Sequence, residues 1–168
     1  MVKALREETG AGIMDCKRAL SDTGGDVEKA KVILREKGLA SAAKKESRET
    51  SQGLVEVYIH GAGRIGAMVE LNCETDFVAR TDEFKGLARD IAMQVVAQSP
   101  RFISPELAPP EVVDAEGLTE ADLKSASLTT QDYFRDPKLS VGEKIKEVIA
   151  KSGENIRIRR FERYELGR

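Results

Sequence analysis

The chain has 168 residues, of which 33% are charged, and its formal net charge is only −2. A balanced, slightly acidic composition argues against a basic surface for nucleic acid. No apolar run reaches membrane-spanning length, and the first turns carry Glu7 and Glu8 in place of an apolar signal core, so we expect a cytoplasmic protein. The two cysteines, Cys16 and Cys73, have neither metal-ligand spacing nor a disulfide pattern, so we expect both to be small buried hydrophobic residues.

Residues 1–43 predict three short helices that are separated by glycines. The first helix is expected to end at Thr9. The second places Ile13, Cys16 and Leu20 at helical spacing, which predicts one buried face. A core this small is marginal by itself, and that favours a module tethered to a larger domain and contacting a partner.

The third helix of this module has signals at both ends. Asp26 is a good N-cap, and Gly38 stands where a left-handed residue commonly ends a helix. Residues 44–52 then contain no apolar side chain. We therefore predict a three-helix module over residues 1–43, a linker or solvated helical extension over 44–52, and a core domain over 53–168.

The core domain opens with two strand patterns. Val55, Val57 and Ile59 recur at every second position and predict one apolar face of a first strand. Residues 65–73 alternate in the same way. Because only residues 61–64 separate the two patterns, we predict an antiparallel hairpin.

A strongly amphipathic helix follows, with Asp82 as its expected cap and an end at Ser99 and Pro100. The stretch 100–117 contains four prolines and is expected to be largely loop. A weaker helical run covers residues 119–127.

The end of the chain predicts one more helix and one more strand. Ser140 and Glu143 form a capping box at the start of the helix, and Gly153 closes it. The last strand is marked by Ile156, Ile158, Phe161 and Tyr164. The expected fold is therefore α+β, with a three-stranded antiparallel sheet packed on helices.

Enzymatic chemistry finds little support in the sequence. Residues 61–66 match the G-x-G-x-x-G fingerprint of dinucleotide-binding proteins, but residues 67–71 continue as a strand where the fingerprint requires a helix. His60 is the only histidine, so no Ser-His-Asp or Cys-His relay can form without another residue as base. We expect a protein that is not an enzyme and that needs no cofactor.

The predicted last strand is rich in arginine, which raises the possibility of RNA binding. Glu162 and Glu165 dilute this charge, and few aromatic residues accompany it. Edge protection and ion pairs across the sheet are therefore favoured, and no direct contact with nucleic acid is expected. The arginines concerned are Arg157, Arg159, Arg160 and Arg163.

The stretch 72–84 places an acidic residue and a large aromatic, Asp76 and Phe77, between a strand pattern and a helix pattern. The connecting residues are polar and offer little local core, so Phe77 is a candidate wedge for a partner. The alternative is that Phe77 folds back under the loop as part of a small satellite cluster. Spacing alone does not decide between the two.

Two segments, Leu5–Leu20 and Asn72–Phe84, resemble the elongation factor Ts family, whose members are nucleotide exchange factors for elongation factor Tu. The hairpin and residues 141–161 extend the similarity over most of the chain. Two separate matches in the expected order argue against a chance resemblance.

The resemblance implies roles for individual residues. In the family, the N-terminal module is similar to ubiquitin-associated (UBA) domains and grips the nucleotide-binding domain of elongation factor Tu, which implies contacts by Arg6, Ile13 and Met14. A Thr-Asp-Phe-Val element disturbs the magnesium site of that GTPase and so promotes release of GDP and loading of GTP. The corresponding residues here are Thr75, Asp76, Phe77 and Val78.

The chain departs from the family pattern in two respects. It starts several residues later in the first helix than is usual, which leaves Val2 and Leu5 to supply that helix's apolar face. It also has one half of a core where long members carry two halves and a coiled coil. It therefore resembles the short members, which act as homodimers. A UBA-like adaptor or binding module without exchange activity is the alternative function.

The predicted sheet itself favours a dimer. Beside the first apolar face, Leu54, Tyr58 and Met68 make the opposite face partly apolar, and one layer of helices cannot cover both. A second copy would cover the remainder and give a two-to-two complex with elongation factor Tu.

Overall fold

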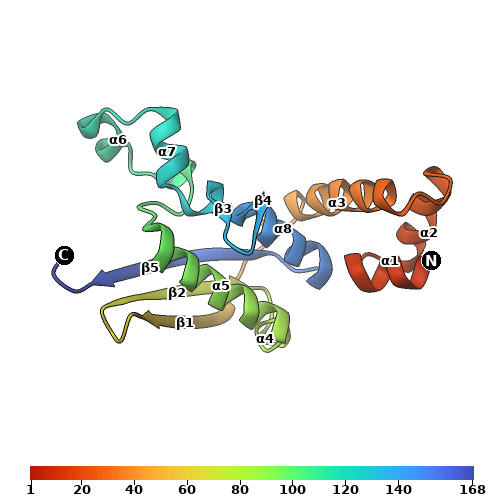
Figure 1. Ribbon diagram of the computed structural model, residues 1–168, viewed down its shortest axis with the longest axis horizontal. Coiled ribbons are helices and arrows are strands. Elements are labelled where there is room, and N and C mark those ends of the chain that lie inside the picture. The colour runs from red at the N-terminus through yellow and green to blue at the C-terminus, as the bar shows by residue number, and fades with distance from the viewer.

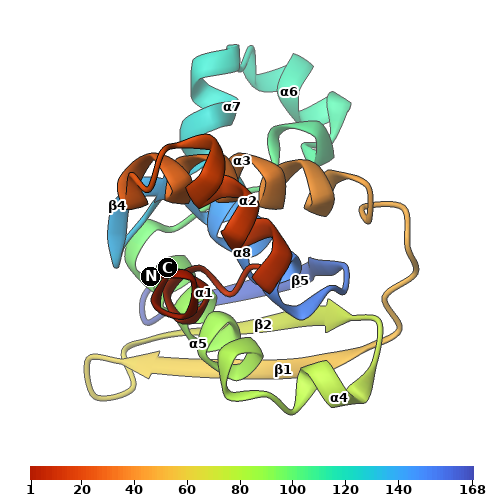
Figure 2. The same cartoon turned by 90° about the vertical axis from the view of Figure 1, so that its right-hand side faces the viewer.

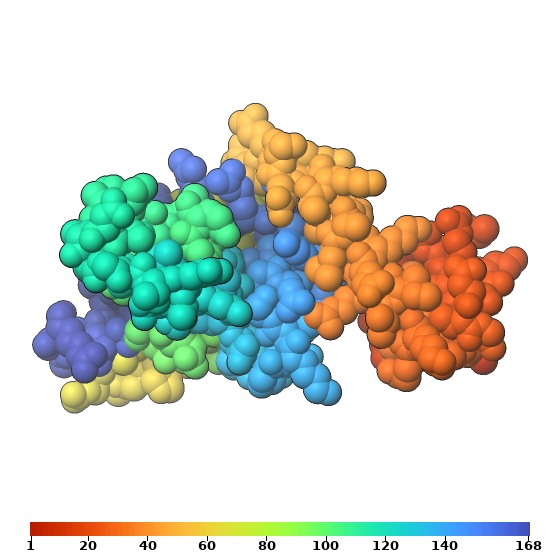
Figure 3. All heavy atoms as spheres, turned by 90° about the horizontal axis from the view of Figure 1, so that it is seen from above, coloured from red at the N-terminus to blue at the C-terminus, as the bar shows by residue number.

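The computed structural model describes residues 1–168 and has the predicted α+β architecture. A three-stranded antiparallel sheet lies against helices, and the N-terminal helices project as a lobe at one end (Figures 1 and 3). None of the helices combines the length and the apolar character needed to cross a membrane.

Three helices make up the N-terminal lobe: α1 (Val2–Thr9), α2 (Ile13–Asp22) and α3 (Val27–Ala43). The predicted cap is confirmed, because the Asp26 carboxylate accepts a hydrogen bond from the backbone N–H of Lys29. Ile13, however, is 56% exposed and is absent from the buried face of α2, where it occupies the first helical position. The buried core of the lobe is Leu5, Cys16, Ala19, Leu20, Ala30 and Leu34.

The prediction that α3 ends at Gly38 is wrong. The helix continues to Ala43, and a Cβ atom on Gly38 would lie only 3.1 Å from the Cβ of Ala150 in α8 (Val141–Ser152). This glycine allows close packing of two helices. Ala42, near the end of α3, is fully buried in the main core. One continuous helix therefore joins the two cores, and the boundaries of module, linker and core domain stay predictions.

The main sheet has the strand order β1-β2-β5, formed by β1 (Gln52–His60), β2 (Ile65–Cys73) and β5 (Ile156–Glu165). The predicted hairpin is confirmed: β1 and β2 are antiparallel, with Val57 opposite Met68. Gly61 and Gly63 have φ angles of 60° and 87°, which a glycine adopts without strain in the turn.

Only one face of the sheet is buried. Val69, Leu71 and Cys73 are fully buried beneath the layer that contains α5 (Asp82–Gln98). Met68 was expected to share a face with Leu54 and Tyr58. Because it lies directly opposite Val57, it is instead on the exposed face.

The first residue of α5 is Asp82, and the cap is Thr81, whose hydroxyl accepts the backbone N–H of Phe84. The prediction of Asp82 as the cap is therefore one residue late, because a threonine fills the same role at this position. The helix ends as predicted, at Ser99, which has a φ angle of 48°.

Residues 100–139 contain more regular structure than the prolines suggest. Pro110 occupies the first turn of a helix and Gly117 ends it in the left-handed conformation, so this proline starts a helix. The weaker helical run is confirmed and is capped by Thr119. The elements are η1 (Pro105–Leu107), α6 (Pro110–Glu116), α7 (Glu120–Ala126), η2 (Leu128–Thr130), β3 (Asp132–Tyr133) and β4 (Asp136–Ser140).

The β3–β4 ribbon is a second sheet that the sequence did not predict. Gln94 of α5 is fully buried beside it. Its side chain donates to the carbonyl of Asp132 at 3.0 Å and accepts the N–H of Phe134 at 3.1 Å. A polar side chain of another element therefore replaces the missing strand partners.

The end of the chain follows the prediction with one change. Ser140 and Glu143 form the capping box of α8, and Gly153 closes that helix. A register shift between Glu70 and Leu71 interrupts the pairing of β2 with β5. Beyond this bulge the alternation changes phase, so Tyr164 is exposed whereas Ile156 is buried.

Two glycines on helices give opposite predictions. Gly86 of α5 is exposed and has nothing within 4 Å of its missing Cβ, so Gly86→Ala should raise the free energy of unfolding by about 0.5–1 kcal/mol. Gly38→Leu should lower it by about 1–3 kcal/mol, because the side chain must push α3 from α8. Urea unfolding of both variants is the measurement, and stabilisation by Gly38→Leu would contradict the close contact.

Candidate partner-binding site

The Asp-Phe pair lies on a very short helix, α4 (Asp76–Ala79), between β2 and α5. Thr75 caps this helix by accepting the backbone N–H of Val78 at 3.4 Å. Phe77 is 81% exposed, so the alternative of a satellite cluster under the loop is wrong. The structure leaves a large aromatic ring in solvent at the end of a buried strand.

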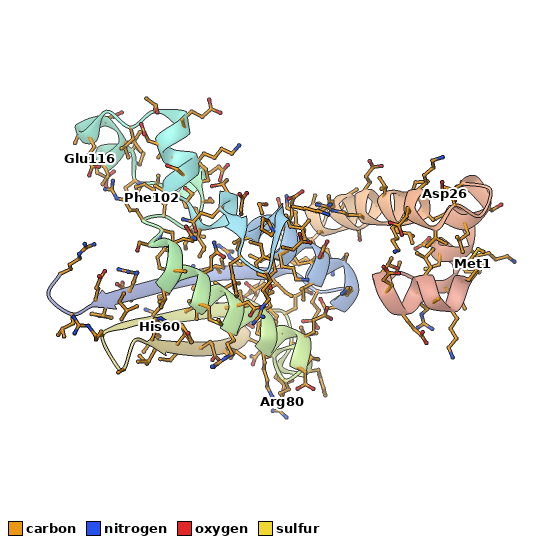
Figure 4. The ribbon with its side chains drawn as sticks, viewed as in Figure 1. Met1, Asp26, His60, Arg80, Phe102 and Glu116 are labelled. Carbon is orange, nitrogen blue, oxygen red and sulfur yellow. The ribbon has the colours of Figure 1, made fainter.

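The four residues of this element divide into two pairs. Thr75 and Val78 hold the helix, since Thr75 caps it and Val78 packs against the main core. Asp76 and Phe77 point outward, and the Asp76 carboxylate forms a 2.8 Å ion pair with Arg80. Figure 4 shows Arg80 beside α4, and its side chain is 77% exposed.

Glu154 and Asn155, which are distant in the sequence, form hydrogen bonds with the residues at the start of this element. Glu154 accepts the backbone N–H of Thr75 at 3.0 Å and its hydroxyl at 2.6 Å. In return, Glu74 accepts the backbone N–H of Asn155 at 2.6 Å. Nothing in the sequence pattern indicates Glu154 as a site residue, because 79 positions separate it from Thr75.

Arg6, Ile13 and Met14 of the N-terminal lobe are all exposed. They lie on α1 and at the start of α2, where Met14 is 65% exposed. The structure brings Ile13 and Met14 together as consecutive exposed apolar residues, but it keeps this lobe apart from α4. Figure 1 shows the lobe at the right-hand end of the molecule and α4 at its lower edge, nearer the middle of the long axis.

The uncovered face of the main sheet is a second apolar surface. Here we call it the outer sheet face; its exposed apolar residues are Val55, Val57, Ile59, Met68 and Tyr164. A shallow hollow of ≈ 330 Å³ lies at its hairpin end and also includes Leu166. Apolar side chains gathered on one face are typical of a surface that contacts another protein.

The arginines of β5 form ion pairs in two cases. Arg160 contacts Glu70 at 2.7 Å on the neighbouring strand, and Arg163 contacts Glu165 at 2.9 Å. The Arg160–Glu70 pair joins neighbouring strands and fits the predicted ion pairs across the sheet, whereas the Arg163–Glu165 pair lies within β5.

Both cysteines are unpaired and buried, as predicted. Burial, together with the nearby charge of Glu154, raises the pKa of the Cys73 thiol to about 11. The Cys73 thiol donates to the carbonyl of Thr75, so it belongs to the support of α4.

A small α+β protein that exposes apolar side chains on a helical lobe, on a short helix and on a sheet face has the design of a protein-binding protein. A family model described as Elongation factor TS matches residues 26–121. The chain is also 51% identical to elongation factor Ts of Carboxydothermus hydrogenoformans, with 99% of this chain and 88% of that protein covered.

Similar agreement extends to two other bacteria. Elongation factor Ts of Caldanaerobacter subterraneus subsp. tengcongensis is 50% identical, with 99% of this chain and 94% of that protein covered. The Heliobacterium modesticaldum protein is 48% identical, with coverage of 99% and 88%. The chain belongs to the elongation factor Ts family, a family of translation elongation factors.

The buried thiols lead to a prediction about reactivity. At pH 8 only about one Cys73 thiol in a thousand is ionised if its pKa is about 11, and the thiolate is the reactive form. In the folded protein, Cys16 and Cys73 should both react slowly with 5,5′-dithiobis(2-nitrobenzoate), and in guanidinium chloride both should react at once. Rapid reaction of one thiol per chain in the absence of denaturant, seen as fast release of one equivalent of chromophore, would contradict this prediction.

Proposed function

We propose that this protein is a guanine-nucleotide exchange factor that acts on elongation factor Tu. The observation that carries the proposal is the exposure of Phe77. Its aromatic ring is 81% exposed and stands beside an acidic residue, on a helix that Thr75 caps and that Val78 attaches to the main core. A large aromatic side chain in this position contributes no burial free energy to its own fold, and it is available to insert into a partner protein.

The physical basis is the way a GTPase holds its nucleotide. The phosphates lie in a backbone cradle and a magnesium ion bridges them, so displacing the groups around that ion weakens the binding of GDP and GTP alike. Asp76 and Phe77 are the residues that would displace these groups. By linkage, the factor must bind the nucleotide-free GTPase more tightly than the loaded one by the same coupling free energy.

The N-terminal lobe would supply a second contact. Arg6, Ile13 and Met14 are exposed, and Figure 2 shows that the lobe and α4 are both accessible from one side of the molecule, which supports binding of a single partner by both parts. Holding the partner at two points raises the effective concentration of the short helix at its target. In the proposed mechanism, binding of the factor displaces the groups around the magnesium ion of the partner. This step calls for no cofactor, nucleic acid or membrane.

The outer sheet face supports a homodimer. Its apolar residues lie opposite the helix layer and have no cover within the chain. A two-fold axis through this face would bury equivalent patches against one another and lead to a two-to-two complex with elongation factor Tu.

Phe77→Ala tests the wedge. We expect it to slow the release of mant-GDP from elongation factor Tu about tenfold at saturating factor, with a change in complex affinity of less than about threefold, because the rest of the interface is intact. Leu107→Ala is the matched control, since Leu107 is also exposed but lies in η1. If Phe77→Ala exchanges nucleotide at the normal rate, the wedge role of Phe77 is overturned. If wild type has no effect on release, the adaptor without exchange activity is the better description.

Val57→Glu tests the dimer. Val57 lies midway along β1 on the outer sheet face, opposite Met68, so a carboxylate buried there in the dimer should shift sedimentation equilibrium at micromolar concentration from dimer to monomer. Val32→Glu places the same charge on an exposed valine of α3 and should leave the mass unchanged. A wild-type mass near the 18.4 kDa of one chain would rule out the dimer.

A further inference from the structure

The helix that carries Asp76 and Phe77 cannot define its own position. It has four residues, far fewer than an isolated helix needs to be stable in water. Of its residues only Ala79 is fully inside the core. Its orientation must therefore come from contacts that lie outside it.

Those contacts form a reciprocal pair. The carboxylate of Glu154 accepts two hydrogen bonds from Thr75, and the carboxylate of Glu74 accepts one from the backbone of Asn155. Each segment thus offers one carboxylate and one backbone N–H to the other. Hydrogen bonds to a charged acceptor are stronger than those between neutral groups. Because these bonds run in both directions between the two segments, they restrict the position and the orientation of the start of α4 relative to the turn at Glu154.

The same turn also holds the chain that leaves the N-terminal lobe. The buried side chain of Asn155 donates to the carbonyls of Glu46 and Arg48, at 3.2 and 2.8 Å. Arg48 in turn reaches Glu74 at 3.4 Å. The turn after α8 is therefore fastened both to the segment before β1 and to the start of α4.

We propose that Glu154 is a positioning residue for nucleotide exchange. It holds Thr75 so that α4 presents Asp76 and Phe77 in one orientation, and it makes no contact with the partner itself. This inference rests on the proposed function. Its physical meaning is preorganisation: a wedge whose position is already fixed loses less conformational entropy when it enters the partner.

The test is a double-mutant cycle on mant-GDP release from elongation factor Tu. Glu154→Ala should slow release about five- to tenfold at saturating factor. In a Phe77→Ala background the same substitution should have almost no further effect, because the aromatic that it positions is gone. Glu116→Ala, which breaks an exposed ion pair with Arg101 far from α4 (Figure 4), should leave release unchanged.

Variants of Thr75 check the same contact from the other side. Thr75→Val removes the hydroxyl that donates to Glu154 and also the N-cap of α4, so combined with Glu154→Ala it should lose less than the sum of the two single losses. Thr75→Ser keeps the hydroxyl, so it should restore most of the release that Thr75→Val loses. Should Glu154→Ala prove unstable in thermal melting, Glu154→Gln, which keeps one acceptor oxygen, should give a smaller loss with the same dependence on Phe77.

The outcomes separate this inference from the function on which it rests. If wild type does not accelerate release, the exchange proposal itself fails, and if Phe77→Ala releases nucleotide at the wild-type rate, the wedge role of Phe77 fails. If Phe77→Ala slows release while both Glu154 variants behave as wild type, only the positioning role is overturned. An equal loss from Glu154→Ala with and without Phe77 would also overturn it, since a general loss of structure does not depend on that ring.

Discussion

Burial of one face of the three-stranded sheet is the constraint on which the rest of this structure depends. Val69 and Leu71 are fully covered by the helix layer, and the main core extends from them to Ala42 of α3 and Val148 of α8. With a single layer of helices, the opposite face has no cover within the chain. The same central strand, β2, ends at Cys73 and leads directly into α4, so the exposed Phe77 stands on a rigid base.

In the proposed exchange site, some residues fix the position of α4 and others are available to contact the partner. Thr75 and Val78 face inward, while Asp76 and Phe77 face outward. Leaving a phenylalanine in water gives up about 1.5–3 kcal/mol that its burial would contribute. Proteins commonly break a rule of local stability at a functional site, and the hydrogen bonds that Glu154 accepts from Thr75 compensate in part for the short helix.

The two cores of the chain are joined by a helix and by polar contacts. α3 contributes Leu34 to the small core of the lobe and Ala42 to the main core. An exposed ion pair of 3.0 Å between Arg35 and Glu143 adds little stability, since such pairs are worth about 0–1 kcal/mol. The position of the lobe therefore depends mainly on the continuity of α3 and on its close contact with α8 at Gly38.

The sequence by itself determined the elements that local signals specify: the β1–β2 hairpin, α5, and the capping box of α8 at Ser140. It also indicated the element around Phe77, but it left two positions for that ring open. Tertiary structure alone decided the features that depend on distant partners. Gly38 is a typical helix end by local chemistry, yet packing against Ala150 carries α3 past it. Glu154 could not be predicted as a site residue, because a hydrogen bond between residues 79 positions apart produces no recognisable pattern in a single sequence.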